Sequence, residues 1–271
     1  MPIIDCHVHL NNYSQINKTV EKSLSLQERL DLLIQSMDHS GIDYSVILSS
    51  YKVDSDRPST SQIIDITKKY DTKLGVVAGF TIDNHTEEDL NDCKSWLTDG
   101  IIKGIKLYCG YEHHYPSDNR YQRVYDLCVE YEVPLMIHTG DVLSKTAKVK
   151  YSHPLNIDDI AVDNPELKII MCHLGNPWFI DCQEILYKNR NVYADISGLT
   201  VGSFTPAAEI YYLDKIKQIL DYLARPHSLL YGTDWPISDI GSYINFVKKL
   251  DLNRESYELL MYKNAKSVFG L

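Results

Sequence analysis

The chain has 271 residues, a formal net charge of −10 and 24% charged residues. This length can bury the core of one large α/β domain, and the acidic balance argues against general binding to nucleic acid, which favours basic surfaces. No basic leader precedes an apolar segment, and every apolar run is too short to span a bilayer. We therefore expect a cytoplasmic protein that binds neither nucleic acid nor membranes.

Cysteine usage points to the same compartment. The six cysteines are scattered and form no C-x-x-C pair. Several lie inside apolar runs, where a buried thiol behaves as a small hydrophobic residue. We expect them to be reduced, as is usual in the cytoplasm, and we do not expect a zinc site built from cysteines.

Short runs of apolar and β-branched residues alternate with longer segments of helical apolar spacing along the whole chain. In the first longer segment, Leu26–Ser40, apolar residues recur on one face and Gly41 follows as a helix stop. The predicted strands are Ile3–His9, Tyr44–Ser49, Leu74–Phe80, Ile101–Tyr108, Pro134–His138, Leu167–Leu174, Val192–Ser197 and Leu229–Asp234. The other predicted helices are Ser61–Tyr70, Leu90–Leu97, Tyr121–Tyr131, Ile157–Val162, Trp178–Tyr187, Tyr212–Leu223 and Tyr243–Leu250.

This alternation of strand and helix predicts a parallel sheet. Eight such units in one chain of this length are typical of a (β/α)8 TIM barrel, an α/β fold. A doubly wound open sheet is the alternative, but its glycine-rich nucleotide-binding turn is absent after the first strand. No linker rich in Pro, Gly or Ser divides the chain, so residues 1–271 are predicted to form a single domain.

Potential metal ligands fall at the carboxyl ends of the predicted strands. His7 and His9 end the first strand, His138 the fifth, His173 the sixth and Asp234 the eighth. A TIM barrel brings these strand ends together at one mouth, where its chemistry takes place. A single histidine in such a place is more often a packed core or loop residue, but five residues at one mouth favour a shared site.

The pleat of the first strand supports this interpretation. Because side chains at i and i+2 share a face, His7 and His9 are predicted to point into the barrel together, with Asp5 one step deeper as a carboxylate that holds a histidine tautomer. The same alternation predicts that Ile4, Cys6 and Val8 face the helices. In the sixth strand it predicts that Ile169, Met171 and His173 point into the barrel.

Imidazoles combined with one carboxylate suit a divalent transition ion with an open position for water. We expect one such ion, with Zn²⁺ preferred and Mn²⁺ or Fe²⁺ as alternatives.

Seven stretches in order along the chain resemble a known family. They are IDCHVH, GIKLY, PLMIHTG, IIMCHLG, VYADISG, LLYGTDWP and the closing NAKSVFGL. Together they resemble the amidohydrolase superfamily, and within it the amidohydrolase-2 branch of metal-dependent TIM-barrel hydrolases. This branch also contains non-oxidative decarboxylases similar to aminocarboxymuconate-semialdehyde decarboxylase and γ-resorcylate decarboxylase.

The resemblance implies four ligands of one metal ion: His7, His9, His138 and Asp234. It places His173 beside the ion, either as a catalytic acid or base or as a further ligand, and gives Asp234 a second role in proton transfer. Relatives with two ions bridge them with a carboxylated lysine, and Lys106 in GIKLY is the candidate here. Lys106 has two other interpretations: a substrate anchor, and a charge that neutralises carboxylates within the barrel.

Substrate contacts are predicted around the same mouth. An aromatic lining favours a flat or apolar substrate, and Arg120 is the best candidate to bind a carboxylate. The predicted contacts are Lys106, Tyr108, His113, Arg120, Trp178 and Trp235. Asp195 and Ser197 on the seventh strand fit either a substrate contact or a buried hydrogen bond.

Because arginines are scarce at the strand ends, we favour a metal-dependent hydrolase of a small amide, ester or lactone that uses a metal-activated water. The alternative is a non-oxidative decarboxylase of an aromatic or muconate-type carboxylate. A TatD-type nuclease fits less well, since that pattern has a glutamate in the fourth strand where this chain has GIKLY. A non-catalytic binding protein is disfavoured because all five ligand-type residues are kept. A homodimer is a further expectation, based on the resemblance alone.

Overall fold

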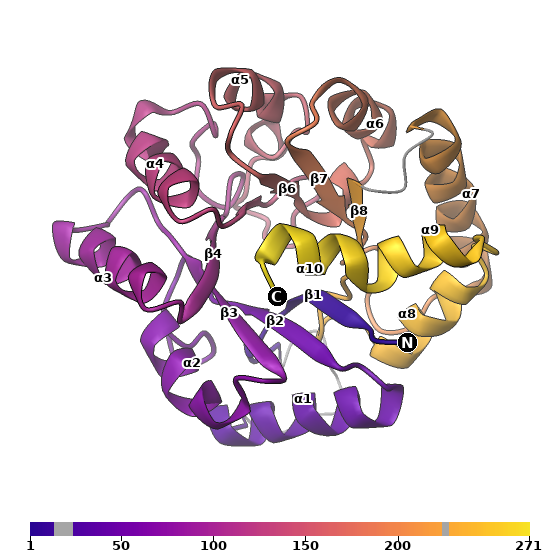
Figure 1. The fold of residues 1–271 in the computed structure, drawn as a ribbon, viewed down its shortest axis with the longest axis horizontal. Helices are drawn as coiled ribbons and strands as arrows, with labels where there is room; N and C mark the ends of the chain where they lie inside the picture. The colour runs from indigo at the N-terminus through magenta and orange to yellow at the C-terminus, as the bar shows by residue number, and fades with distance from the viewer. Residues whose placement is uncertain (14–23, 224–227) are drawn as a thin grey trace.

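A computed structural model describes residues 1–13, 24–223 and 228–271, and within them eight parallel strands follow one another in sequence order around a barrel (Figure 1). The strands are β1 (Ile4–Val8), β2 (Tyr44–Leu48), β3 (Leu74–Gly79), β4 (Ile102–Leu107), β5 (Leu135–Ile137), β6 (Ile169–Met171), β7 (Val192–Asp195) and β8 (Leu229–Leu230). The predicted (β/α)8 TIM barrel is therefore confirmed.

The barrel is closed between its first and last strands by backbone hydrogen bonds. The N–H of Cys6 donates to the carbonyl of Tyr231 at 3.0 Å, and the N–H of Asp234 donates to the carbonyl of His7 at 2.8 Å. β8 was predicted to continue to Asp234, but it ends at Leu230, and Asp234 has a φ of 65°, which lies outside the β region. These bonds hold the segment after β8 against β1.

Helices surround the strands and begin at well-defined capping residues. Capping boxes start α1 at Ser25, α2 at Ser59 and α3 at Thr86, and Gly41 ends α1 at a φ of 72°. The helices after successive strands are α1 (Leu26–Ser40), α2 (Thr60–Thr67), α3 (Glu87–Thr98), α4 (Gln122–Glu130), α5 (Asn156–Asp163), α6 (Phe179–Lys188), α7 (Pro206–Leu223) and α8 (Ile240–Lys248). Short 3₁₀ turns are η1 (Lys68–Tyr70), η2 (Asn119–Tyr121), η3 (Val149–Tyr151) and η4 (Cys172–Gly175).

The C-terminal segment closes the end of the barrel opposite the strand carboxyl ends. It consists of α9 (Arg254–Glu258), the π-helical turn η6 (Leu259–Lys263) and α10 (Asn264–Phe269). Figure 1 shows α10 lying across the centre of the ring of strands. Val268 and Phe269 of α10 pack in one cluster with Ile4 at the start of β1. The opposite end of the barrel is left open for the site.

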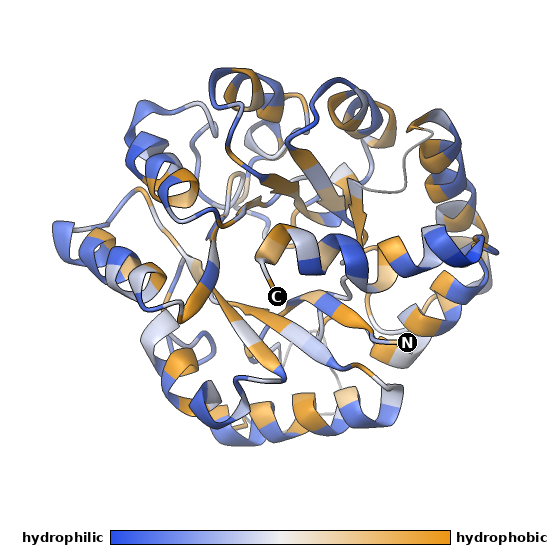
Figure 2. Ribbon diagram, viewed as in Figure 1, coloured by the Kyte–Doolittle hydropathy of each residue, from blue (hydrophilic) through white to orange (hydrophobic). Residues whose placement is uncertain are grey.

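The buried apolar residues form two clusters, one inside the barrel and one in the layer between the strands and the helices. Apolar residues dominate the strands (Figure 2). Val8 faces the helices as expected, but Ile4 and Cys6 belong to the interior cluster, so their predicted orientation was wrong. The register of β1 against β2 shifts between Asp5 and Val8, which reverses the alternation of the pleat.

The predicted orientation of β6 was wrong for a different reason. Ile169 and Met171 pack with the helices, and Ile170 and Cys172 face the interior. The sequence count assumed an extended backbone as far as His173. In the structure β6 ends at Met171, and the chain then turns.

Candidate metal centre and active site

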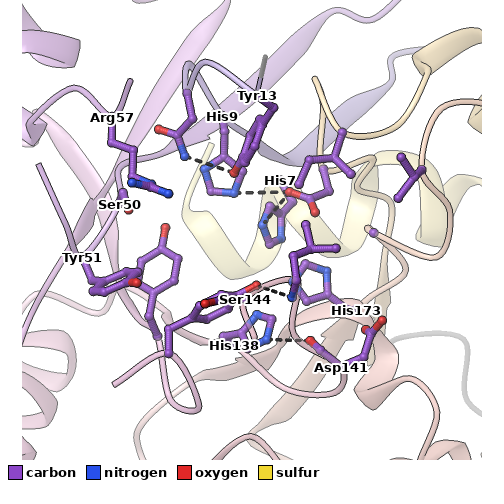
Figure 3. A pocket seen from close by; sticks show the side chains of 18 of the residues that line it. His7, His9, Tyr13, Ser50, Tyr51, Arg57, His138, Asp141, Ser144 and His173 are labelled. Atoms are coloured by element: carbon purple, nitrogen blue, oxygen red, sulfur yellow. Dashed lines mark hydrogen bonds and ion pairs between the residues drawn. The ribbon is translucent and has the colours of Figure 1, made fainter. Parts of the chain in front are cut away.

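The five ligand-type residues predicted from the sequence come together at the carboxyl ends of the strands. They line a single cavity of about 740 Å³ (Figure 3). These residues are His7, His9, His138, His173 and Asp234. Each is at least nine-tenths buried, so little of these side chains is exposed to solvent.

His7, His9 and Asp234 form the most compact group of potential ligands. Nε2 of His9 lies 3.3 Å from Oδ1 of Asp234, and Nε2 of His7 lies 3.7 Å from the same oxygen. One ligand atom from each residue lies within 4.8 Å of the others. This spacing allows the three residues to bind one ion.

The donor atoms of this group are suited to a cation. Nδ1 of His9 lies 2.8 Å from the carbonyl oxygen of Leu48, which can only accept, so Nδ1 carries the proton and Nε2 presents a lone pair. Oδ1 of Asp234 is buried and has no hydrogen-bond partner within residues 1–13, 24–223 and 228–271. Lone pairs therefore converge with no proton between them, an arrangement that a divalent ion would satisfy.

The charge of Asp234 suits this role. Burial acts to raise its pKa, but the neighbouring imidazoles of His9, His7 and His173 lower it below the ordinary value overall. Burial lowers the pKa of the His7 imidazole, which favours the neutral form that binds metals.

His138 and His173 lie next to this group, just after the ends of β5 and β6. The ring of His173 is 4.9 Å from that of His7 and 5.0 Å from that of His138, centroid to centroid. Nε2 of His138 lies 3.0 Å from the carbonyl oxygen of Asp141 (Figure 3). Burial lowers the pKa of His138 well below its ordinary value and that of His173 to about 4.

The backbone at the end of β6 aims His173 into the cavity. His173 and Leu174 have φ values of 63° and 50°, a left-handed conformation that is uncommon for residues with a side chain. The N–H of His173 donates to Oδ1 of Asp195 at 2.9 Å, which helps to hold this turn. His173 is thus oriented by a turn rather than by the pleat of β6.

The carboxylate beside the ring of His7 is Asp195, at the end of β7, and not Asp5. Oδ2 of Asp195 lies 2.9 Å from Nδ1 of His7. Asp5 instead accepts from the backbone N–H of His7 and from the N–H and hydroxyl of Thr233. The predicted role of Asp5 toward the imidazole was therefore wrong, because the register shift in β1 turns its side chain toward Thr233.

Asp195 is ionised. Burial acts to raise its pKa, but the electrostatic interaction with the imidazole of His7 and the hydrogen bonds from His7 and Ser197 outweigh burial and hold the pKa far below its ordinary value. Ser197 lies within 3.1 Å of Nδ1 of both His7 and His173. Of the two interpretations left open by the sequence, the structure places Asp195 and Ser197 in buried hydrogen bonds.

A second group of potential ligands, His7, Cys172 and Asp195, is less suited to an ion. Asp195 already accepts hydrogen bonds on both carboxylate oxygens. Burial raises the pKa of the Cys172 thiol above its ordinary value, which disfavours the thiolate that binds metals. Lys106 donates to Sγ of Cys172 at 2.5 Å, deep in the barrel.

Comparison with known proteins places this site in a family. A family model described as amidohydrolase matches residues 4–271. The chain belongs to this amidohydrolase family. Its members are metal-dependent enzymes that act on small molecules, and the protein is an enzyme.

Solved structures similar to this amidohydrolase share its fold along their whole length. An uncharacterized TIM-barrel protein from Bordetella bronchiseptica is 19% identical with a TM-score of 0.77, and 100% of this chain and 99% of that chain are covered. A probable 2-pyrone-4,6-dicarboxylic acid hydrolase from Acinetobacter baumannii, with citric acid bound, is 16% identical with a TM-score of 0.69, and both chains are covered completely.

A third similar structure is a mutant of 5-carboxyvanillate decarboxylase from Novosphingobium aromaticivorans with bound manganese. It is 13% identical with a TM-score of 0.72, and 100% of this chain and 97% of that chain are covered. No curated protein matches the sequence significantly. In the described residues of this amidohydrolase, no helix is long and apolar enough to cross a membrane.

The predicted substrate contacts divide into two groups. Lys106 and Tyr108 line the amidohydrolase cavity, and the Tyr108 hydroxyl donates to the carbonyl of Ser49 at 2.6 Å. The other four predicted contacts are not among the residues that line the cavity: His113, Arg120, Trp178 and Trp235.

Each of these four has another partner. His113 contacts the carbonyl of Thr146, and Arg120 pairs with Asp118 on the surface. Trp178 packs against His153, with ring centroids 4.7 Å apart, and Trp235 packs against the apolar layer beneath the helices. A position next to a strand-end motif in the sequence therefore does not predict that the side chain faces the cavity.

The sequence argument missed Arg57, which lines the cavity of this amidohydrolase from the loop after β2. One amino group of its guanidinium donates to Asp54 at 2.6 Å. Figure 3 shows Arg57 and Tyr51 on one side of the cavity and His7 and His173 on the other. Every β-to-α loop opens at the same mouth, so a search of whole loops rather than strand ends could have found Arg57.

Proposed function

We propose that this amidohydrolase is a metal-dependent hydrolase that cleaves the amide, ester or lactone bond of a small molecule. The observation that carries the proposal is the buried Oδ1 of Asp234, which has no hydrogen-bond partner in the described residues and lies beside two imidazoles in a cavity that also contains His173. A metal site with an adjacent proton acceptor is the arrangement that hydrolysis by an activated water requires.

The residues proposed to hold the ion are His7, His9, His138 and Asp234. Zn²⁺ suits these nitrogen and oxygen donors, with Mn²⁺ or Fe²⁺ as alternatives, and the manganese in the decarboxylase from N. aromaticivorans supports Mn²⁺ as a candidate. When bound, such an ion supplies Lewis acidity that polarises a carbonyl and makes water nucleophilic near neutral pH.

The residues of the chain provide the proton transfer. Asp234 or His173 accepts the proton of the attacking water and later delivers it to the leaving group, since both side chains face the cavity. Burial of these residues excludes bulk water, which strengthens their interactions with a bound substrate.

The cavity lining indicates the chemical class of the substrate. Tyr51 lies between Tyr108 and Tyr111, with ring centroids 5.2 and 5.9 Å away, so one wall is aromatic. Arg57 and Lys106 add cationic groups to the same cavity. A planar substrate that carries a carboxylate fits this lining, and the A. baumannii relative, named as a dicarboxylic acid hydrolase with citric acid bound, supports this class.

A non-oxidative decarboxylase is the second candidate. The side chains of Arg57 and Lys106 also favour this reaction, because decarboxylation needs the substrate carboxylate to be held near the metal ion. In this version Asp234 or His173 would protonate carbon. The similar structures include decarboxylases as well as a hydrolase, which supports keeping both reactions.

The deciding experiment is a substrate panel on protein loaded with Zn²⁺ or Mn²⁺. The panel pairs lactones, amides and esters, each with and without a carboxylate, with aromatic and muconate-type carboxylates. We expect hydrolysis of a carboxylated lactone, amide or ester, detected as the released acid, alcohol or amine. Release of CO₂ without hydrolysis would favour the second candidate instead.

The six cysteines are free and buried, which supports the predicted reducing, cytoplasmic environment.

A further inference from the structure

β7 contributes none of the proposed metal ligands, yet its carboxyl end contacts two of the cavity histidines. Asp195 and Ser197 are completely buried. They touch His7 of β1 and His173 after β6, so they join elements on both sides of β7 in the barrel. We propose that Asp195 and Ser197 act as a positioning pair that sets the tautomers of His7 and His173, so that both rings present a free Nε2 to the cavity.

Asp195 is the acceptor at the centre of this arrangement. Its Oδ1 accepts from the N–H of His173 at 2.9 Å, from the N–H of Ser197 at 3.1 Å and from the hydroxyl of Ser197 at 2.5 Å. Its Oδ2 lies 2.9 Å from Nδ1 of His7. Because a carboxylate can only accept, Nδ1 of His7 carries the proton and Nε2 is left with a lone pair.

Ser197 transmits the same constraint to His173. Its single hydroxyl proton is used on Asp195, so its oxygen can only accept from imidazoles. Nδ1 of His173 lies 3.0 Å from this hydroxyl oxygen and 3.2 Å from the carbonyl oxygen of Ser197. Both neighbours accept, so Nδ1 of His173 carries its proton and Nε2 is free.

The backbone around the pair is shaped to allow this contact. Gly198 has a φ of 66°, and a Cβ at this position would lie only 2.5 Å from Nδ1 of His173. A side chain there would push the imidazole away from Ser197. The segment Asp195–Gly198 therefore provides the acceptors and also the space for the ring.

Two consequences follow for the site. The free Nε2 of His7 is the atom that faces Asp234, as a metal ligand must. The free Nε2 of His173 can accept a proton or bind an ion, but it cannot donate a hydrogen bond while the ring is neutral. His173 thus enters the reaction as an acceptor.

Tautomers can be measured directly, by two-bond ¹H–¹⁵N correlation spectra of the imidazoles in metal-free protein at neutral pH. Variants His7→Gln and His173→Gln assign the two signals. We expect both wild-type rings to show protonated Nδ1 and unprotonated Nε2. A protonated Nε2 on either ring would overturn the proposal, even before a residue of β7 is changed. The measurement reads tautomers and not turnover, so it does not depend on which reaction the enzyme catalyses.

The variant Asp195→Asn gives a sharper test. The asparagine carbonyl would take the three donors that now face Oδ1, which leaves the amide NH₂ facing Nδ1 of His7. We expect His7 to change to the Nε2-protonated tautomer while His173 keeps its own, and Zn²⁺ affinity to fall about 10- to 100-fold. A His7 signal that stays unchanged would refute the role of Asp195.

Ser45→Ala is the matched control, because Ser45 is a fully buried strand serine whose hydroxyl has no hydrogen-bond partner in the described residues. We expect it to leave both tautomers and Zn²⁺ affinity unchanged. Ser197→Ala removes one acceptor of His173 and keeps the carbonyl, so we expect a mixture of His173 tautomers. If Ser45→Ala changed the tautomers as much as Asp195→Asn does, the effect would come from general loosening of the barrel. That result would reject the positioning role of Asp195 and Ser197.

Discussion

His9 and Asp234 follow the first and last strands of the barrel, and Nε2 of His9 lies 3.3 Å from Oδ1 of Asp234. The N–H of His9 also donates to the carbonyl of Trp235 at 2.7 Å, so the backbone holds the two side chains in place. The bonds that close the barrel therefore assemble the proposed metal site as well. Folding and metal binding should be coupled for this reason.

The first prediction concerns this coupling. At a free Zn²⁺ concentration of about 100 times Kd, one site stabilises the folded state by about 2.7 kcal/mol. For a chain of this size we expect Tm to rise by about 5–10 °C. Asp234→Asn removes the carboxylate and should abolish most of the rise, as measured by scanning calorimetry. An equal rise in the variant would remove Asp234 from the ligand set.

The second prediction separates metal binding from catalysis. His173→Ala should keep most of the Zn²⁺-dependent rise in Tm, because the compact group of ligands does not include His173. Turnover of a substrate found in the panel should fall about 10²- to 10⁴-fold, as expected for the loss of a proton-transfer group. His113→Ala, outside the cavity, serves as the control and should match wild type. Loss of bound Zn²⁺ in His173→Ala would identify His173 as a ligand instead.

The third prediction tests substrate recognition with two arginines in similar pairs. Arg57 lines the cavity and pairs with Asp54, whereas Arg120 pairs with Asp118 and does not line the cavity. Arg57→Met should lower kcat/KM for a carboxylated substrate about 10- to 100-fold, the contribution of charge-assisted hydrogen bonds. Arg120→Met should have little effect. Equal losses in the two variants would show that Arg57 does not contact the carboxylate.

Local sequence patterns predicted the elements well where local interactions determine them. The helix Leu26–Ser40 has the predicted bounds because Ser25 and Glu28 cap its start and Gly41 its end. The strand ends likewise placed the ligand-type residues at one mouth, since parallel topology alone brings them there. These parts of the fold need no knowledge of contacts between distant residues.

Orientation could not be predicted in the same way. The register shift in β1 and the left-handed turn at His173 both reverse a face that regular alternation assigns. The contact of Asp195 with His7 and the place of Arg57 in the cavity depend on how separate elements pack. Sequence spacing carries no information on such contacts, so the sequence chose Asp5 rather than Asp195 as the partner of the His7 imidazole and did not identify Arg57 as a cavity residue.

The last prediction concerns Glu112, a buried carboxyl in the loop after β4. Its Oε1 accepts from the Thr81 hydroxyl at 2.5 Å and from the N–H of Ile82 at 3.0 Å. Burial raises the pKa of Glu112 above its ordinary value of 4.5 despite these bonds. Between the ordinary and the raised pKa the folded state binds more protons than the unfolded state, so stability falls as pH rises through that window.

Glu112→Gln stays neutral at every pH and should remove this loss. We expect the variant to match wild type well below pH 4.5, where Glu112 is protonated in both states, and to be the more stable protein at neutral pH. Urea unfolding at a series of pH values measures the difference. Glu87→Gln is a control of opposite sign, because the hydrogen bond and charge of Arg123 lower the pKa of Glu87, so its variant should lose stability at neutral pH. If Glu112→Gln proved less stable than wild type at neutral pH, the bonds to Thr81 and Ile82 would outweigh the cost of burying the charge.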